Sequence, residues 1–60
     1  MKATITIDMD NAAFEGDYGI ELGRILRRLA EHCEDSGTPS ESRTLRDLNG
    51  NTCGQFRIDD

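Results

Sequence analysis

Five acidic residues near the start of the chain have a spacing that could form a binding site. They fall between positions 8 and 21, a stretch that contains no Lys or Arg. Carboxylates grouped in this way can ligate a divalent cation or present negative charge to a basic partner. The five residues are Asp8, Asp10, Glu15, Asp17 and Glu21.

A divalent cation is the first possibility, because Asp8 and Asp10 form a carboxylate pair. A calcium loop beginning at Asp8 needs Gly at its sixth position and Glu at its twelfth, where the chain has Ala13 and Gly19. A magnesium-dependent phosphoryl-transfer site needs a basic partner, and this stretch offers none. We therefore predict no metal site and no cofactor.

His32 and Cys33 are the other candidates for chemistry. A zinc site needs three or four ligands at short spacings, and no further Cys or His lies near this pair. No Ser or Asp stands at a spacing that indicates a nucleophilic triad with His32. Two cysteines make at most one bridge, whereas a small secreted domain usually carries several. We expect Cys33 and Cys53 to be reduced thiols in small apolar sites, and we predict that the protein is not an enzyme.

The length and the net charge of the chain narrow the possible functions further. The chain has 60 residues and a net charge of -5, from 7 Lys or Arg and 12 Asp or Glu. A chain of this length folds as one domain, here residues 1–60, and has little interior for a closed substrate pocket. No apolar run is long enough to cross a bilayer, and no signal peptide is apparent. We expect a soluble cytoplasmic protein whose mature form is these 60 residues.

The elements that position the acidic residues follow from periodicity. Residues 2–10 alternate between apolar and polar, which predicts a half-buried strand. Residues 11–17 form a loop in which Phe14 closes one end of the core. A helix capped by Asp17 begins at Tyr18 and runs to about Asp35, with one apolar stripe and a charged opposite face. Residues 36–42 form a connection, and Ile20 points away from the stripe.

The C-terminal segment predicts a hairpin, because Asn49-Gly50 is the strongest short turn signal. A two-residue turn places Leu48 opposite Asn51 and Leu45 opposite Gly54. Gly54 then either leaves room for a bulky helix side chain or marks a bulge. The core face of the hairpin contains Leu45, Gly54, Phe56 and Ile58, and the other face contains Arg46, Cys53, Gln55 and Arg57.

We predict an α+β fold of the β-α-β-β type, with one helix packed on a three-stranded sheet that ends in a C-terminal hairpin. A right-handed crossover makes the first two strands parallel and favours the order 1-3-2, while 3-1-2 and 1-2-3 stay open. The predicted core consists of Ile5, Ile7, Met9, Phe14, Leu22, Ile25, Leu26, Leu29, Cys33, Leu45, Phe56 and Ile58.

Segments in all three regions carry a resemblance. They read Ile-Thr-Ile-Asp-Met-Asp-Asn-Ala-Ala-Phe in the strand, Gly-Arg-Ile-Leu-Arg-Arg-Leu-Ala in the helix and Leu-Arg-Asp-Leu-Asn-Gly-Asn in the hairpin. Together they resemble small acidic proteins of phages and mobile elements. In size, acidity and element order the chain is similar to anti-CRISPR proteins that act on type I systems. The resemblance implies a non-catalytic inhibitor in the bacterial host cytoplasm that binds a CRISPR effector complex and mimics DNA.

The charge distribution is compatible with this implication. An effector complex holds nucleic acid in a positively charged channel, so the five acidic residues are expected to bind its basic DNA-binding surface in competition with DNA. The acidic balance disfavours direct nucleic-acid binding by the chain itself. The single apolar helix stripe, with only Ile20 left outside, predicts a monomer.

Two other functions stay open. A small phage or plasmid regulatory protein could bind DNA or a host protein as a dimer, using hairpin arginines such as Arg46 and Arg57. An accessory subunit of an enzyme could dock through Ile20. Salt-sensitive retention of DNA in a gel shift would favour the regulator over the DNA mimic.

Overall fold

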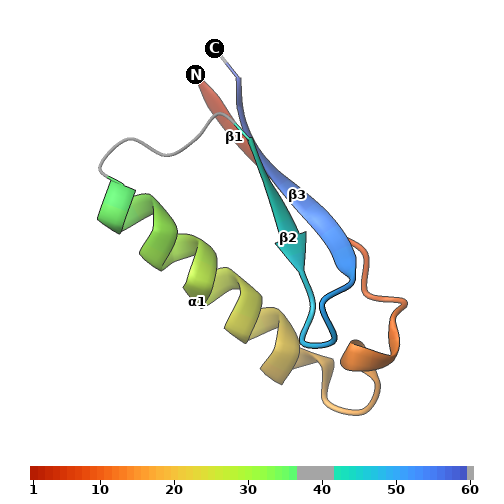
Figure 1. The fold of residues 1–60 in the computed structure, drawn as a ribbon. Coiled ribbons are helices and arrows are strands. Elements are labelled where there is room, and N and C mark those ends of the chain that lie inside the picture. Colours follow the sequence, from red (N-terminus) through yellow and green to blue (C-terminus); the bar gives the residue numbers. More distant parts are fainter. Residues whose placement is uncertain (37–41, 60) are drawn as a thin grey trace.

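A computed structural model describes residues 1–36 and 42–59. Along the chain lie β1 (Lys2–Ile7), the short 3-10 helix η1 (Ala12–Phe14), α1 (Tyr18–Ser36), β2 (Ser42–Arg46) and β3 (Thr52–Asp59). The strands form one antiparallel sheet in the order β1-β3-β2, and α1 packs against it (Figure 1). The predicted α+β class, element order and central third strand are confirmed. Most of the predicted connection, residues 37–41, lies outside the described residues.

β1 ends at Ile7, three residues earlier than predicted. Beyond it, the backbone N–H of Asp10 donates to Oδ1 of Asp8 at 3.0 Å, a local side-chain bond that takes the place of strand pairing. The chain then enters η1, where the N–H of Phe14 donates to the carbonyl of Asn11 at 3.0 Å. Phe14 is buried and contributes to the core, as the sequence predicted.

α1 begins at the predicted residue because Asp17 caps it. The Asp17 carboxylate accepts the backbone N–H of Gly19 at 3.2 Å, which satisfies one of the free donors of the first turn. Ile25 and Leu29 form the buried centre of the helix. Ile20 is 71% exposed, as the helical periodicity predicted.

The hairpin has a three-residue turn rather than the predicted two-residue turn. The N–H of Gly50 donates to the carbonyl of Asp47 at 3.0 Å, and the N–H of Asp47 donates to the carbonyl of Asn51 at 2.9 Å. Gly50 adopts a φ of 85°, in the left-handed region that glycine enters without steric cost. Asp47 is therefore the residue opposite Asn51, so the predicted pairing of Leu48 with Asn51 is wrong.

A β-bulge restores the predicted register farther from the turn. Arg46 lies opposite Thr52, but Leu45 lies opposite Gly54, so Cys53 is an extra residue in β3. The longer turn and the bulge shift the register in opposite directions, which is why the predicted pairing of Leu45 with Gly54 is confirmed. The bulge also changes the alternation of faces. Cys53 is therefore buried in the core, whereas the sequence placed it on the opposite face.

Gly54 is required by the backbone of β1 and not by a helix side chain. It lies opposite Ile7 in the β1–β3 ladder. A Cβ at this position would overlap the carbonyl group of Thr6. The sequence offered two explanations for Gly54, which were space for a helix side chain and a bulge. The bulge is present beside Gly54, and the space is occupied by the backbone of β1.

The buried core is smaller than predicted. Ile5, Met9 and Leu26 were predicted inside but are 47%, 36% and 39% exposed. A helix is about 10 Å wide and strands lie about 4.8 Å apart, so one helix leaves an edge strand partly uncovered. Ile7, Cys33 and Ile58 pack against the core from its margin. The buried apolar residues are Phe14, Ile25, Leu29, Leu45, Cys53 and Phe56.

Candidate binding surfaces

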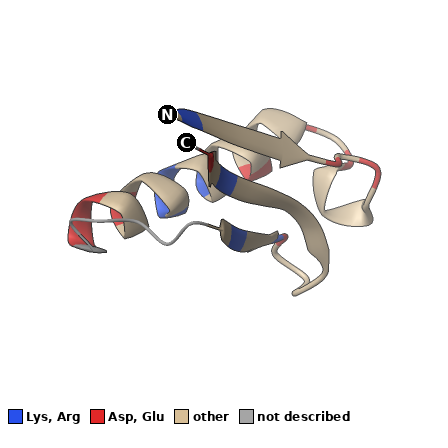
Figure 2. Cartoon of the chain, turned by 90° about the horizontal axis from the view of Figure 1, so that it is seen from above, with Lys and Arg blue, Asp and Glu red and all other residues tan. Residues whose placement is uncertain are grey.

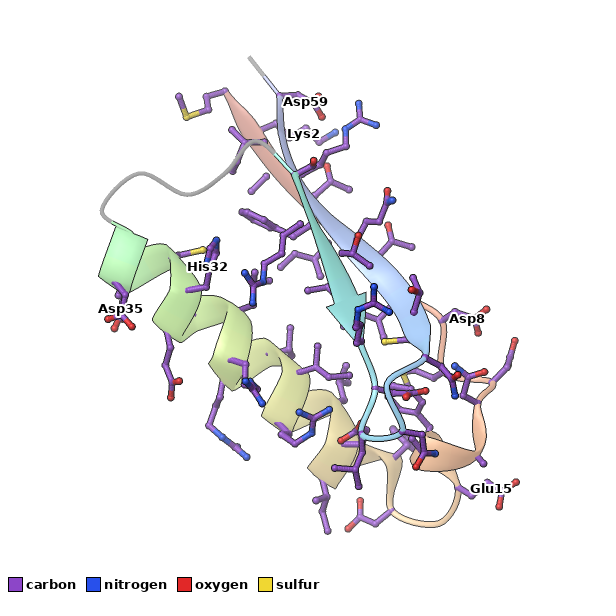
Figure 3. The ribbon with its side chains drawn as sticks, viewed as in Figure 1. Lys2, Asp8, Glu15, His32, Asp35 and Asp59 are labelled. Carbon is purple, nitrogen blue, oxygen red and sulfur yellow. The ribbon has the colours of Figure 1, made fainter. Side chains whose placement is uncertain are left out.

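Four of the five predicted acidic residues form an exposed group that we call the acidic end. They come from the segment after β1, the loop around η1 and the cap of α1, and they gather at one end of the molecule (Figure 2). Asp8 and Glu15 both lie at this end (Figure 3). Among residues 1–36 and 42–59, no Lys or Arg forms an ion pair with any of the four. The acidic end consists of Asp8, Asp10, Glu15 and Asp17.

Asp8 and Asp10 interact directly. A side-chain hydrogen bond with Asp8 and, after it, repulsion from the Asp8 charge raise the pKa of Asp10 above its ordinary value. A positive group near a carboxylate favours its ionised form. This pair is therefore suited to an Arg or Lys side chain of a partner.

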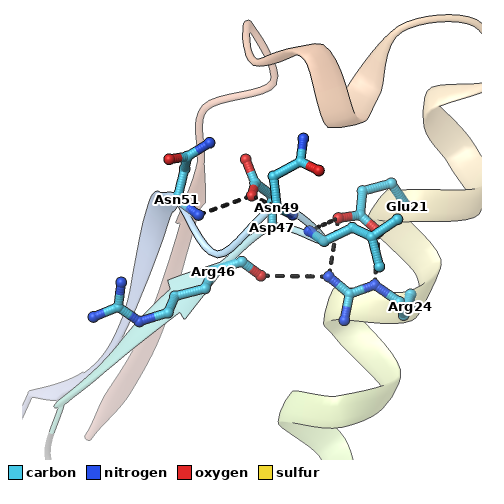
Figure 4. Close-up of polar contacts among 7 residues, drawn as sticks. Glu21, Arg24, Arg46, Asp47, Asn49 and Asn51 are labelled. Atoms are coloured by element: carbon cyan, nitrogen blue, oxygen red, sulfur yellow. Dashed lines mark hydrogen bonds and ion pairs between the residues drawn. The ribbon is translucent and has the colours of Figure 1, made fainter.

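Glu21, the fifth predicted site residue, does not belong to the exposed group. It is only 6% exposed, and both of its carboxylate oxygens bind Arg24, at 2.6 Å to Nε and 2.9 Å to Nη2 (Figure 4). Oε2 also accepts the backbone N–H of Leu48 at 2.6 Å. The hydrogen bond from Arg24 is the main cause that holds the pKa of Glu21 below its ordinary value. The structure therefore separates Glu21 from the other four predicted residues, because the fold brings the hairpin turn onto its carboxylate.

Asp47 is a second buried carboxylate, which sequence reasoning missed. It is 4% exposed, and Oδ1 accepts the backbone N–H groups of Asn49 at 2.9 Å and Asn51 at 3.0 Å. Oδ2 accepts the side-chain amide of Asn11 at 3.0 Å. An Asp two residues before an Asn-Gly turn is a known signal for this arrangement. Together with Glu21 and Arg24, Asp47 forms what we call the hairpin network, which joins the turn to α1 and to the loop before η1.

A cleft of about 440 Å³ separates α1 from β2 and has a basic lining. Arg24 and Arg28 lie on its helix side, and Arg43 and Arg46 lie on its strand side. Its apolar lining includes the buried residues Ile25, Leu29 and Leu45. We call this feature the arginine groove.

The arginines of the groove differ in what they already bind. Arg24 is held by Glu21 and reaches the carbonyl of Arg46 at 3.5 Å. Arg46 donates to the carbonyl of Gly50 at 3.2 Å. Arg43 lies 3.1 Å from Nδ1 of His32, and since a guanidinium only donates, that nitrogen is the acceptor. The groove thus has few positive groups free to bind a ligand.

The surroundings of Cys53 do not favour a reactive thiol. Both thiols are unpaired, Cys53 buried and Cys33 half-buried. Burial is the main cause that raises the pKa of the Cys53 thiol, and the charge of Asp47 adds to it. A thiol held in its protonated form is a poor nucleophile.

The described residues contain no group of three or more His, Cys, Asp or Glu side chains placed to hold a metal ion. In the same part of the chain, no helix is long and apolar enough to span a membrane. Comparisons with protein-family models, curated proteins and solved structures gave no match. Surface charge, burial and geometry are therefore the basis for a functional proposal.

Proposed function

We propose that this protein is a non-catalytic binding protein that uses its acidic end to contact a basic surface of another protein. One observation carries the proposal: four carboxylates lie exposed at one end of the molecule, and no described Lys or Arg pairs with them. The four differ from other exposed acids such as Glu31 and Glu34 because they lie in a stretch that contains no Lys or Arg.

The physical basis is electrostatic complementarity. Opposite charges speed the encounter of two proteins and fix their relative orientation. The repulsion between Asp8 and Asp10 strengthens the argument, because a basic side chain of the partner would relieve it. Binding of this kind needs no closed pocket and no catalytic group.

The resemblance to anti-CRISPR proteins supports a specific partner. A CRISPR effector complex binds nucleic acid in a positively charged channel, and its basic side chains face the DNA backbone. Carboxylates presented at that surface would compete with DNA. In this proposal the protein acts as a DNA mimic in the bacterial cytoplasm, and its partner is the DNA-binding surface of an effector complex.

A double variant tests the proposal, Asp10→Asn with Glu15→Gln. It removes two charges from the acidic end while keeping side-chain size and leaving the Asp17 cap intact. The matched control is Glu31→Gln with Glu34→Gln, which removes two exposed charges from α1 far from the acidic end. Binding to a type I effector complex is measured by calorimetry at several salt concentrations, and DNA competition is measured in parallel.

We expect the acidic-end variant to bind at least about tenfold more weakly and with a smaller salt dependence, because each exposed charge steers and stabilises the complex. The control should bind like the parent. Equal losses in both variants would mean that only net charge matters, and unchanged binding in both would show that the acidic end is solvated surface. No binding by the parent chain would remove the effector complex as the partner.

The arginine groove favours a second candidate function, the DNA- or protein-binding regulator. Arg28 and Arg43 line opposite sides of the groove and could contact phosphates. A gel shift at low salt, with Arg28→Gln and Arg43→Gln as variants, tests this function. Retention of DNA by the parent that both variants weaken would favour the groove over the acidic end.

A further inference from the structure

Two of the apolar residues that the core leaves partly uncovered, Ile5 and Leu26, lie on the same side of the fold. On α1, Leu26 and the half-buried Leu22 lie on the flank opposite Arg24 and Arg28, across the buried line of Ile25 and Leu29. Since the arginine flank faces β2, the leucine flank faces β1. There Ile5 of β1 is 47% exposed and Leu26 is 39% exposed, so this margin of the fold is incompletely covered.

β1 is also an open edge of the sheet. It pairs only with β3, and the described residues place no other backbone partner against it (Figure 1). The segment Lys2–Ile7 contains no Pro, no Gly and no bulge, and its helix-facing residues carry no charge. Natural proteins protect free edges with such features, or they use the edge for pairing.

The ladder with β3 shows which backbone groups of β1 are free. The N–H of Asp8 donates to the carbonyl of Cys53 at 2.6 Å, and these two residues continue the register in which Ile7 pairs with Gly54. In an antiparallel ladder alternate residues bond to the same neighbour. The even-numbered residues therefore bond to β3, and the N–H and C=O groups of Ala3, Ile5 and Ile7 point outward.

We infer that β1 pairs with β1 of a second copy of this chain, antiparallel and with the two-fold axis at Ile5. In that register Ile5 pairs with its own copy, and Ala3 pairs with Ile7 of the second copy. All three outward-facing residues then form hydrogen-bonded pairs. The result is a continuous six-stranded sheet with both helices on one face, and the exposed Ile5 and Leu26 side chains of the two copies come together.

Charge complementarity selects this register among those that the backbone allows. Lys2, the only lysine of the chain, lies opposite Asp8 of the second copy, and the symmetry produces this ion pair twice. Moving the axis by one residue places Lys2 opposite Thr6, which is uncharged, or opposite Asp10, whose backbone has left the strand and bonds to the Asp8 side chain. Thr4 lies opposite Thr6 on the same open face, a favourable cross-strand pair.

The other free edge does not fit a second copy. β2 has the sequence Ser-Arg-Thr-Leu-Arg, and both of its arginines line the arginine groove. Pairing two copies of β2 would bring these positive charges together, which is unfavourable. The inferred dimer does not rest on the proposed function, but it engages Asp8 of the acidic end and leaves Asp10, Glu15 and Asp17 outside the paired segment. It departs from the monomer that the single apolar helix stripe predicts.

The oligomeric state of the full chain tests the inference by sedimentation equilibrium over a range of concentrations. We expect a dimer for the parent and a monomer for Ile5→Lys, whose new charges meet at the two-fold axis. Ile20→Lys is the matched control on the far side of α1, where the native side chain is 71% exposed, and it should remain a dimer. A monomeric parent at all concentrations, or a dimer that survives Ile5→Lys and dissociates in Ile20→Lys, would overturn the inference.

Charge reversal tests the register itself. Asp8→Lys should weaken dimerisation by at least about tenfold, because it faces Lys2 of the second copy. Adding Lys2→Asp should restore the dimer by exchanging the two charges. Ile5→Cys gives a second readout that does not depend on stability, since hydrogen-bonded strand pairs have Cα atoms within disulfide reach. Oxidation should link two Ile5→Cys chains and leave the parent unlinked, and the opposite result would place the axis elsewhere.

Discussion

The acidic end and the hairpin network contain the same kind of residue, yet the fold uses them differently. Glu15 and Glu21 are six positions apart in one acidic stretch. Glu15 is exposed at the acidic end, whereas Glu21 binds Arg24 and the N–H of Leu48, a residue 27 positions away. The difference shows that the role of a carboxylate depends on what the tertiary fold places against it. The buried one stabilises the fold, and the exposed one stays available to a partner.

The largest expected effect is on stability and separates the two regions directly. Glu21→Ala leaves Arg24 without its carboxylate and the N–H of Leu48 without its acceptor, so it should cost about 2–3 kcal/mol of unfolding free energy. Glu15→Ala, the matched change at the acidic end, should cost less than about 0.5 kcal/mol. Urea denaturation followed by circular dichroism measures both. Equal costs would mean that the acidic end is also structural.

Acidification should weaken the hairpin network. The pKa of Glu21 is lower in the folded state than its ordinary value, so its stabilising contribution is complete at a pH above that ordinary value. The contribution is lost as the pH falls through the folded pKa, where the carboxylate is protonated. Unfolding midpoints measured from neutral to acidic pH should therefore fall in the parent. In Glu21→Gln this part of the decrease should be absent, and an unchanged slope would show that other carboxylates cause it.

Asp17 combines both roles and should give an intermediate effect. Its carboxylate is exposed at the acidic end but also accepts the N–H of Gly19 at the start of α1. Asp17→Ala should cost about 1 kcal/mol, the usual value of a helix cap. Asp17→Asn should recover most of that stability while removing the charge. If Asn and Ala destabilise the protein equally, the negative charge near the helix terminus is more important than the hydrogen bond.

Local patterns predicted the elements well. The strand at β1, the cap at Asp17 and the buried positions of Ile25 and Leu29 are set by neighbours in sequence, and all three are confirmed. The strand is shorter and more exposed than the period-two pattern predicted. The order of the strands also followed, because a short hairpin and a helical crossover leave few arrangements. The strand, the cap and the buried helix positions depend on residues a few positions apart in the sequence.

Contacts between distant segments were harder to predict. Cys53 is buried because a bulge follows a turn one residue longer than expected, and the pattern of β3 alone does not reveal the bulge. Glu21 and Asp47 are buried because the turn, η1 and α1 meet, which no spacing in the sequence shows. The acidic end was predictable, because it depends only on which residues are acidic and on their position in a loop. Which of the acidic residues are exposed and which are buried could be seen only from the tertiary fold.

The smallest expected effect concerns the pair of carboxylates within the acidic end. Asp8 raises the pKa of Asp10 through a side-chain hydrogen bond and through its negative charge. Both causes are absent in Asp8→Asn, because the Asn side chain carries no charge and cannot share a carboxyl proton. The pKa of Asp10, followed by carboxyl-carbon NMR, should then move down toward its ordinary value. A raised folded-state pKa contributes stability at a pH below the ordinary value, and this contribution is lost as the pH rises through the folded pKa. At neutral pH the substitution should therefore leave the fold as stable as the parent or slightly more stable.

Glu15→Gln is the control, because Glu15 does not contribute to the shift and its removal should leave the pKa of Asp10 unchanged. A pKa that stays raised in Asp8→Asn, or that falls equally in Glu15→Gln, would show that the charges of the acidic end do not interact as the structure indicates.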